Sequence, residues 1–253
     1  MTIASTPATL HTLREHARDL LNEFDAADGL AAYYALYHDP KRTTLFIHHD
    51  PDGVVGGFLA RCQTGFDLLR PLVTLRARRA SALTALIDEG LLPARPYLLV
   101  APPPLAESLM PHLDLHIISR NVVYRLDPKR YRHEVNVLVV TGRTPEGHPR
   151  AEIRRGAEVA AVAGVNWRSP IFAEVYVNVE PEYQQRGWGS SVVNAVVGEL
   201  LAMGVTPLYS AAEDQAASQA LAWSVGFVDS GAREVMAQAA RPMPLLPVPP
   251  PNR

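Results

Sequence analysis

A short polar run with two glycines, Y-Q-Q-R-G-W-G-S-S at residues 183–191, has the composition of an anion-binding turn. The apolar, β-branched stretch 171–179 precedes it, and apolar residues at helical spacing follow it over 192–203. The run therefore joins a strand to the start of a helix. The first amides of a helix have no partners within the helix, and the helix dipole adds partial positive charge to them.

Four residues of this turn suit contact with a phosphate group. Gly187 and Gly189 would let an anion approach the helix amides closely, Ser190 would cap the helix, and Arg186 would add a mobile positive charge. A pair of glycines is also typical of a plain strand-to-helix turn. A dinucleotide fingerprint is incomplete, because Val192 replaces its third glycine. The turn alone leaves the phosphate site and the plain turn both open.

The context of the turn is more specific. Residues 179–189, V-E-P-E-Y-Q-Q-R-G-W-G, resemble the acyl-CoA loop of GNAT-type N-acetyltransferases, written V-x-P-x-[YF]-[QR]-x-x-G-x-[GA] after a strand. Downstream, Q-A-A-S-Q-A-L-A-W-S-V-G-F at 215–227 is similar to the family's N-x-x-S-x-x-L-Y-x-x-x-G-F helix and strand. The likeness covers roughly residues 135–238. It implies an α/β (α+β) GNAT fold, a mixed central sheet with helices on both faces.

The resemblance also implies an activity, the transfer of an acetyl group from acetyl-CoA to a primary amine by direct attack in a ternary complex. The pantetheine arm of the cofactor would bond the main chain of Val177 and Val179, and the Val177 amide would stabilise the developing oxyanion. The amides around the glycines would hold the pyrophosphate. This loop comprises Gln184, Gln185, Arg186, Gly187, Trp188, Gly189 and Ser190.

The groups that would move protons are less clearly marked. An ammonium acceptor must lose a proton before it attacks, directly or through water, so a carboxylate or histidine is expected nearby. Glu174 in F-A-E-V-Y-V is the first choice, since some members of the resembled family have a glutamate base at a similar offset; a solvent-facing glutamate is the alternative. The family's usual acid, a tyrosine, is replaced by Ala222, which leaves Tyr209, Ser218 or water for that role. Ala222 also keeps open a catalytically silent, CoA-binding regulatory module.

The elements that must position these residues alternate along the chain. Helical spacing predicts helices over 9–24, 28–37, 81–90, 104–111, 190–203 and 214–225. Apolar, β-branched runs predict strands over 43–49, 56–62, 66–75, 96–101, 115–126, 135–141, 151–155, 158–167, 171–179, 206–210 and 227–237.

The order of elements partly repeats after residue 133, which predicts two α/β halves. We expect a divergent, acetyltransferase-like half at 1–128, a catalytic GNAT half at 129–240 and a flexible proline-rich tail at 241–253. The first half has no glycine between Leu75 and its following helix, so one CoA per chain is expected.

Composition limits the partners. The 253 residues are 47% hydrophobic and 20% charged with a net charge of -2, so a nucleic-acid surface is not expected.

The single cysteine, Cys62, excludes an internal disulfide and favours a reducing compartment, and no signal peptide or membrane span is evident. We expect a cytoplasmic protein that acts on a small-molecule or peptide amine, with a homodimer left open. No metal is expected, because His48 and His49 point to opposite faces of a strand and Asp50 begins a turn.

Overall fold

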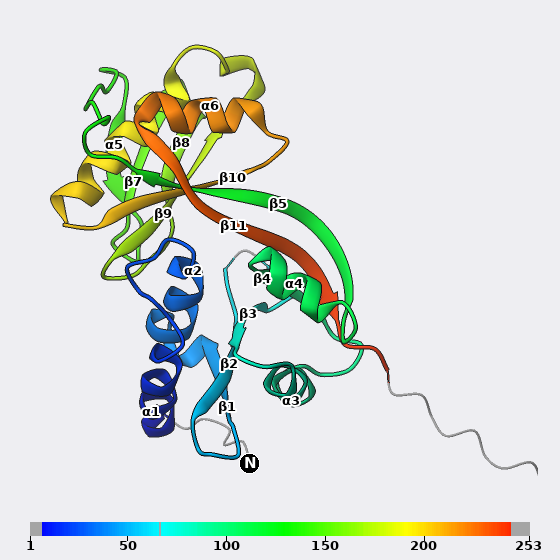
Figure 1. The fold of residues 1–253 in the computed structure, drawn as a ribbon. Coiled ribbons are helices and arrows are strands. Elements are labelled where there is room, and N and C mark those ends of the chain that lie inside the picture. Colours follow the sequence, from blue (N-terminus) through cyan, green and yellow to red (C-terminus); the bar gives the residue numbers. More distant parts are fainter. Residues whose placement is uncertain (1–6, 66, 244–253) are drawn as a thin grey trace, which may run out of the picture. The chain divides into compact units, whose positions relative to one another are not determined.

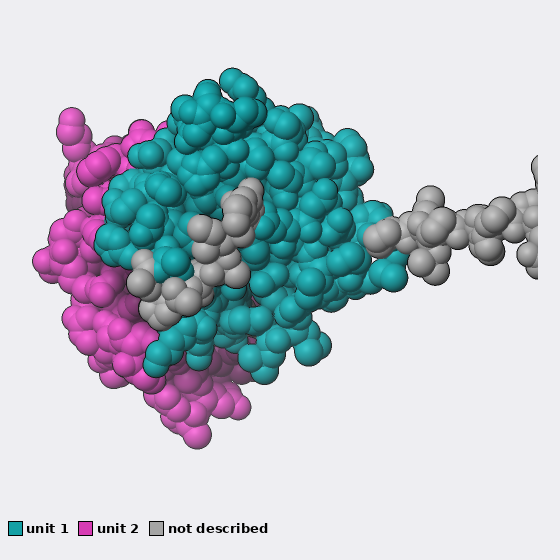
Figure 2. All heavy atoms as spheres, turned by 90° about the horizontal axis from the view of Figure 1, so that it is seen from below, with its two compact units in different colours: residues 1–20, 34–118, 236–253 teal, residues 21–33, 119–235 magenta. Residues whose placement is uncertain are grey.

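The structure is a computed structural model that describes residues 7–65 and 67–243 (Figure 1). The chain forms two compact units, which Figure 2 distinguishes by colour. Unit 1 comprises Met1–Leu20, Tyr34–Ile118 and Met236–Arg253, and unit 2 comprises Leu21–Tyr33 and Ser119–Val235. No helix of the described residues is long and apolar enough to cross a membrane.

Unit 1 is a mixed sheet with helices on both faces. Its strands run in the order β1-β2-β3-β4-β11-β5, with β1 to β3 antiparallel and β4 parallel to β3. Consecutive residues of β1 and β2 are buried, which requires cover on both sides. The strands are β1 (Thr43–His49), β2 (Val55–Cys62), β3 (Leu72–Ala77) and β4 (Pro96–Ala101), with parts of β5 (Asp114–Leu126) and β11 (Phe227–Ala240). The helices are α1 (Pro7–Arg18), a π-helix (Tyr33–Tyr37, its first residue in unit 2), a 3-10 turn (Pro40–Arg42), α3 (Ala80–Gly90) and α4 (Pro103–Leu109).

Unit 2 has the sheet order β11-β5-β10-β9-β8-β7-β6. Strands β6 to β9 are antiparallel, β10 is parallel to β9, and β5 is antiparallel to β10. Its strands are β6 (Val140–Arg143), β7 (Pro149–Arg155), β8 (Glu158–Arg168), β9 (Phe172–Val179) and β10 (Thr206–Ala212). Its helices are α2 (Gly29–Ala32), a 3-10 turn (Pro181–Tyr183), α5 (Trp188–Ala202) and α6 (Ala216–Val225).

The two units repeat one plan, which confirms the predicted two-half organisation. Three antiparallel strands lead to a helix, a parallel strand, a second helix and a long final strand: β1-β2-β3-α3-β4-α4-β5, then β7-β8-β9-α5-β10-α6-β11. Each long final strand supplies residues to both units. The division between the units falls at 118/119 within β5, which continues as one strand to Leu126.

Several boundaries differ from the sequence predictions; helix α1, for example, ends at Arg18 rather than at 24. Strand β3 begins at Leu72 rather than at 66, because the Asp67 carboxylate accepts from the amides of Leu69 and Arg70 in a turn. The strand expected over 135–141 forms only from Val140 onward. Arg241, expected in the tail, forms a β-bridge to Pro93 in unit 1, and residues 244–253 lie outside the described residues.

The core of unit 2 holds the candidate turn in place. Helix α5 packs on β7, β8, β9 and β10, and the face it covers is almost wholly aliphatic. Val192, Val193 and Val197 of α5 are fully buried there. Burial of several such side chains, at about 1.5–3 kcal/mol each, fixes the helix and therefore its first turn.

Candidate active site

Strands β9 and β10 diverge at the candidate site. They pair from Thr206↔Phe172 to Tyr209↔Val175, after which β9 continues in register with β8. The amide of Glu180, just after β9, donates to a carbonyl on the β8 side, so alternation turns the backbone groups of Val177 and Val179 to the opposite side. These groups point into the gap that the divergence opens. They offer main-chain donors and acceptors to a ligand.

Helix α5 starts beside this gap, and the structure requires glycine at positions 187 and 189 for different reasons. Gly187 is the N-cap residue with φ 72°, a conformation that strains other residues, and a Cβ there would meet nothing within 4 Å. A Cβ on Gly189 would lie 2.8 Å from Leu221 Cδ1 and 3.2 Å from Val179 Cγ2. Backbone conformation therefore requires the first glycine, and close packing requires the second.

The expected cap at Ser190 is wrong. The helix begins at Trp188, two residues earlier than predicted, and no side chain of the described residues caps it. The Ser190 hydroxyl instead lies 3.0 Å from the hydroxyl of Ser224 on α6. The first amides of α5 are thus left without a protein cap, as an anion-binding helix terminus requires.

Two stacked aromatic rings contact the guanidinium group of Arg186, the positive charge of the turn. The rings of Tyr183 and Trp188 stack with centroids 5.4 Å apart, and the Arg186 guanidinium lies 5.5 Å from each centroid. Its Nη2 also donates to the Glu182 carbonyl at 3.3 Å. These contacts keep the charge beside the first turn of α5, where it adds to the helix dipole.

One open cavity of about 660 Å³ joins the strand gap to the helix terminus. All the predicted cofactor residues except Arg186 line it, as do the predicted catalytic residues Tyr209 and Ser218. Glu174 is not among its lining residues. The lining comprises Val177, Asn178, Val179, Tyr183, Gln184, Gln185, Gly187, Trp188, Gly189, Ser190, Tyr209, Gln215, Ala217, Ser218 and Leu221.

Tyr209 and Ser218 form a hydroxyl pair on the cavity wall. Their oxygens are 2.9 Å apart, and the pair joins β10 to α6. Burial raises the pKa of Tyr209, which is only 3% exposed, so the phenol is protonated at neutral pH. Ala222, at the position where the resembled family has tyrosine, is fully buried in the core of the unit. The structure thus brings together the two hydroxyls that the sequence offered as candidate proton donors.

Glu174 lies on the other face of β9. The valines of β9 pack toward α5, whereas Tyr176, which shares the face of Glu174, covers Gly164 of β8. Asn166 Nδ2 donates to the Glu174 carboxylate at 3.3 Å, and no described cationic side chain forms an ion pair with it. Burial of the carboxyl group raises the pKa of Glu174 above its usual range. In register, Glu174 pairs with Leu208, so it stands beside Tyr209 along the strands but on the opposite face.

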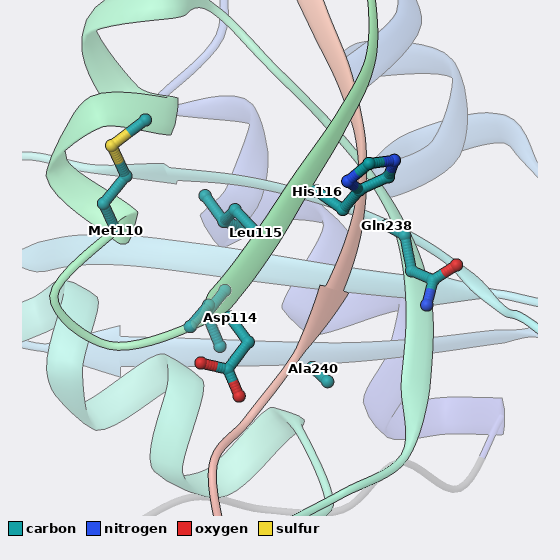
Figure 3. Close-up of a pocket in the computed structure, with 7 residues that line it drawn as sticks. Met110, Asp114, Leu115, His116, Gln238 and Ala240 are labelled. Carbon is teal, nitrogen blue, oxygen red and sulfur yellow. The ribbon is translucent and has the colours of Figure 1, made fainter.

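A second cavity, of about 470 Å³, lies in unit 1 (Figure 3). Asp114, His116 and Gln238 contribute polar groups, but the Asp114 carboxylate points away from the other two. No glycine turn or helix start borders this groove, and the remaining lining is mainly aliphatic. The convergent polar chemistry of the described residues is that of unit 2.

No protein-family model matches the sequence, and no curated protein matches it. Solved structures do. A tandem GNAT protein from the clavulanic acid biosynthesis pathway is 16% identical with a TM-score of 0.63, covering 96% of this chain and 99% of its own. A GCN5-related N-acetyltransferase from Sphaerobacter thermophilus is 15% identical with a TM-score of 0.60, covering 97% and 98%. One from Kribbella flavida is 16% identical with a TM-score of 0.54, covering 76% and 90%. The chain therefore has the GNAT fold, in two halves.

Proposed function

We propose that unit 2 is an acetyltransferase site that moves an acetyl group from acetyl-CoA to a primary amine. One observation carries the proposal: the gap between β9 and β10 and the uncapped start of α5 open into the same cavity. A CoA thioester has an amide-rich arm that needs main-chain partners and a pyrophosphate that needs an anion site. The backbone of Val177 and Val179 suits the first, and the amides from Gly187 to Ser190 suit the second.

The two proton transfers would take place on the two faces of β9. When bound, acetyl-CoA supplies the thioester that the amine attacks. Glu174 would take the proton of the ammonium group through water, because Glu174 and Val177 are about 10 Å apart along the strand. The Val177 amide would donate to the negative charge that develops on the carbonyl oxygen. As the nitrogen–carbon bond forms, the carbon–sulfur bond would break, and the Tyr209 hydroxyl would protonate the departing thiolate, with Ser218 as its hydrogen-bond partner.

The competing proposal is a CoA-binding module without catalysis, which Ala222 favours. Calorimetric titration of CoA and acetyl-CoA, followed by single-turnover release of the CoA thiol with a panel of amines, separates the two. Cys62 does not disturb a thiol assay of the native protein, since it is fully buried and its pKa is raised to about 12. Release with at least one amine supports the enzyme. Binding without release from any amine supports the silent module, and absence of CoA binding overturns both.

Glu174→Gln tests the base. We expect turnover at neutral pH to fall by roughly 100 to 10,000-fold, with a smaller deficit at high pH, where free amine accumulates. Glu180→Gln is the matched control, because Glu180 is an exposed carboxylate just past the end of the same strand. Near-normal rates in Glu174→Gln would assign proton removal to water or to another residue.

A further inference from the structure

A bulge in β8 places two consecutive side chains on the face that carries Glu174. Strands β8 and β9 pair in register up to Val165↔Val175, and the register then shifts so that Trp167 lies opposite Glu174. Regular alternation would put Trp167 on the same face as Val165. The extra residue, Asn166, reverses this, so that Asn166 and Trp167 both lie on the face of Glu174.

Both bulge residues act on the Glu174 carboxyl group. Asn166 Nδ2 donates to its Oε2 at 3.3 Å. Trp167 is 3% exposed, and its Nε1 is buried with no hydrogen-bond partner among the described residues. A buried donor left without a partner destabilises the fold, so this N–H favours a nearby acceptor. Burial raises the pKa of Glu174, whereas the Asn166 amide and the Trp167 indole act against that rise by favouring the ionised form.

The indole is held from its other side. The ring of Tyr33 stacks on Trp167 with centroids 5.6 Å apart and an interplanar angle of 23°. A Cβ on Gly29 of α2 would lie 3.3 Å from Trp167 Cη2 and 3.1 Å from Leu208 Cδ1. Helix α2 therefore packs directly against the indole, and such close packing leaves it little room to rotate.

Other charged or titratable groups lie near Glu174, on its own face of the sheet or on the neighbouring strand. Tyr209 on β10 is close enough for Glu174 to raise its pKa, and the Arg125 guanidinium of β5 lies 5.5 Å from the centroid of the Phe172 ring. Tyr176 shares the face on β9, and Tyr33 covers the indole. Asn166 donates a hydrogen bond to the Glu174 carboxylate, and the Trp167 N–H is a buried donor without an acceptor among the described residues.

We infer that Asn166 and Trp167 are positioning residues that orient the Glu174 carboxylate for proton transfer, with the Trp167 N–H as its second donor. The inference rests on the proposed function, in which Glu174 is the base. Neither residue contacts the cavity, so each acts through the carboxylate. A desolvated base that accepts a hydrogen bond from Asn166 and has the Trp167 N–H available as a second donor keeps a fixed direction and stays ionisable.

The test is the pKa of Glu174 itself, measured by NMR on protein labelled with carbon-13 at glutamate carboxyls, with Glu174→Gln identifying the resonance. Asn166→Ala and Trp167→Phe each remove a donor to the ionised form, so each should raise that pKa. Trp167→Phe keeps an aromatic ring against Tyr33 and is the milder change to packing. Trp223→Phe is the matched control, because Trp223 is 58% exposed and lies on α6.

Activity gives the second readout. In both variants the acid limb of the kcat/KM profile should move to higher pH, with the rate at neutral pH lowered by roughly 10 to 100-fold and recovering as pH rises. An unchanged Glu174 pKa in both variants overturns the inference, even if the rate falls, since the loss would then be structural. If the wild-type protein transfers no acetyl group, the proposed function fails, whereas shifts of the Glu174 pKa would still support the positioning.

Discussion

The two units share an order of elements but differ in the turn between the third strand and the helix that follows. In unit 2 this turn carries Gly187 and Gly189, and in unit 1 it carries Arg76, Arg78 and Arg79. The N-cap of α3 is Arg79 in an extended conformation (φ -142°), whereas Gly187 at α5 is left-handed. Both helices have a dipole and neither has a side-chain cap among the described residues, but only the turn before α5 carries glycines that would let an anion approach the amides. We therefore expect an anion site to depend on the turn residues rather than on the strand-turn-helix plan.

The units also use the same strand divergence in opposite ways. In unit 1, β3 and β4 pair only at Leu72↔Leu98 and Val73↔Leu99, much as β9 and β10 separate in unit 2. In unit 1 the region between these strands and helices α3 and α4 is closed by buried apolar side chains, among them Leu75 and Leu109. The same divergence therefore extends a hydrophobic core in unit 1 and borders an open cavity in unit 2.

The largest effect should come from the glycine that distinguishes the two turns. Gly187→Asp adds bulk, backbone strain and a negative charge where the anion would bind, so CoA affinity should fall by roughly 100-fold or more in calorimetry. Gly204→Asp is a close control, because Gly204 has the same φ of 72° and its Cβ would also meet nothing within 4 Å. Unchanged affinity in Gly187→Asp, or equal losses in both variants, would remove the anion site from this turn.

The hydroxyl pair on the cavity wall should have the next largest effect. Tyr209→Phe removes the proposed proton donor, and we expect kcat to fall by about 100-fold with CoA affinity nearly unchanged. Ser218→Ala should cost less, since it removes only the partner of that hydroxyl. A thioester whose thiol is more acidic should narrow the deficit of Tyr209→Phe. If Tyr209→Phe lowers kcat equally with acetyl-CoA and with the thioester of the more acidic thiol, water rather than Tyr209 supplies the proton.

The glycine turn and the order of elements were predictable from the sequence, because turn chemistry and strand-helix alternation are local. The hydroxyl pair was predicted only as separate candidates, since Tyr209 and Ser218 meet through the packing of α6 on β10. No pattern in the sequence indicated that Asn166 and Trp167 lie beside Glu174. In G-V-N-W regular alternation predicts the wrong face for the tryptophan, and a bulge depends on pairing with a distant strand.

Buried titratable groups should give the two units opposite dependence on pH. In unit 1, burial lowers the pKa of His38 from 6.5 to about 4, and its Nδ1 lies 2.8 Å from the Thr43 hydroxyl. The unfolded chain then binds the proton first, so stability is lost as pH falls from about 6.5 toward 4. In unit 2, the pKa of Glu174 is raised above 4.5, so stability is lost as pH rises through that value.

Urea unfolding between pH 4 and 8 checks both signs. His38→Gln should flatten the loss at acid pH, and Glu174→Gln should increase the free energy of unfolding at neutral pH relative to the wild type. A stabilised but inactive Glu174→Gln would fit a buried base that is kept for function at some cost to the fold. Destabilisation by Glu174→Gln at neutral pH would contradict the raised pKa.

The smallest effect should come from the arginines of the unit 1 turn. Arg78 and Arg79 are exposed, and Arg79 Nε lies 3.8 Å from the buried Asp50 carboxylate, an interaction within unit 1. If side chains at this turn screen the helix amides, no second pyrophosphate site exists there, and surface arginines contribute only weak, salt-screened attraction. Calorimetry should therefore give one CoA per chain, with less than about a two-fold change in affinity for Arg78→Ala or Arg79→Ala at physiological ionic strength.

Arg186→Ala is the matched variant in unit 2 and should weaken binding more, because the Arg186 charge is held beside uncapped amides. Two equivalent sites per chain, or a larger loss from Arg79→Ala than from Arg186→Ala, would show that the unit 1 turn also binds the cofactor.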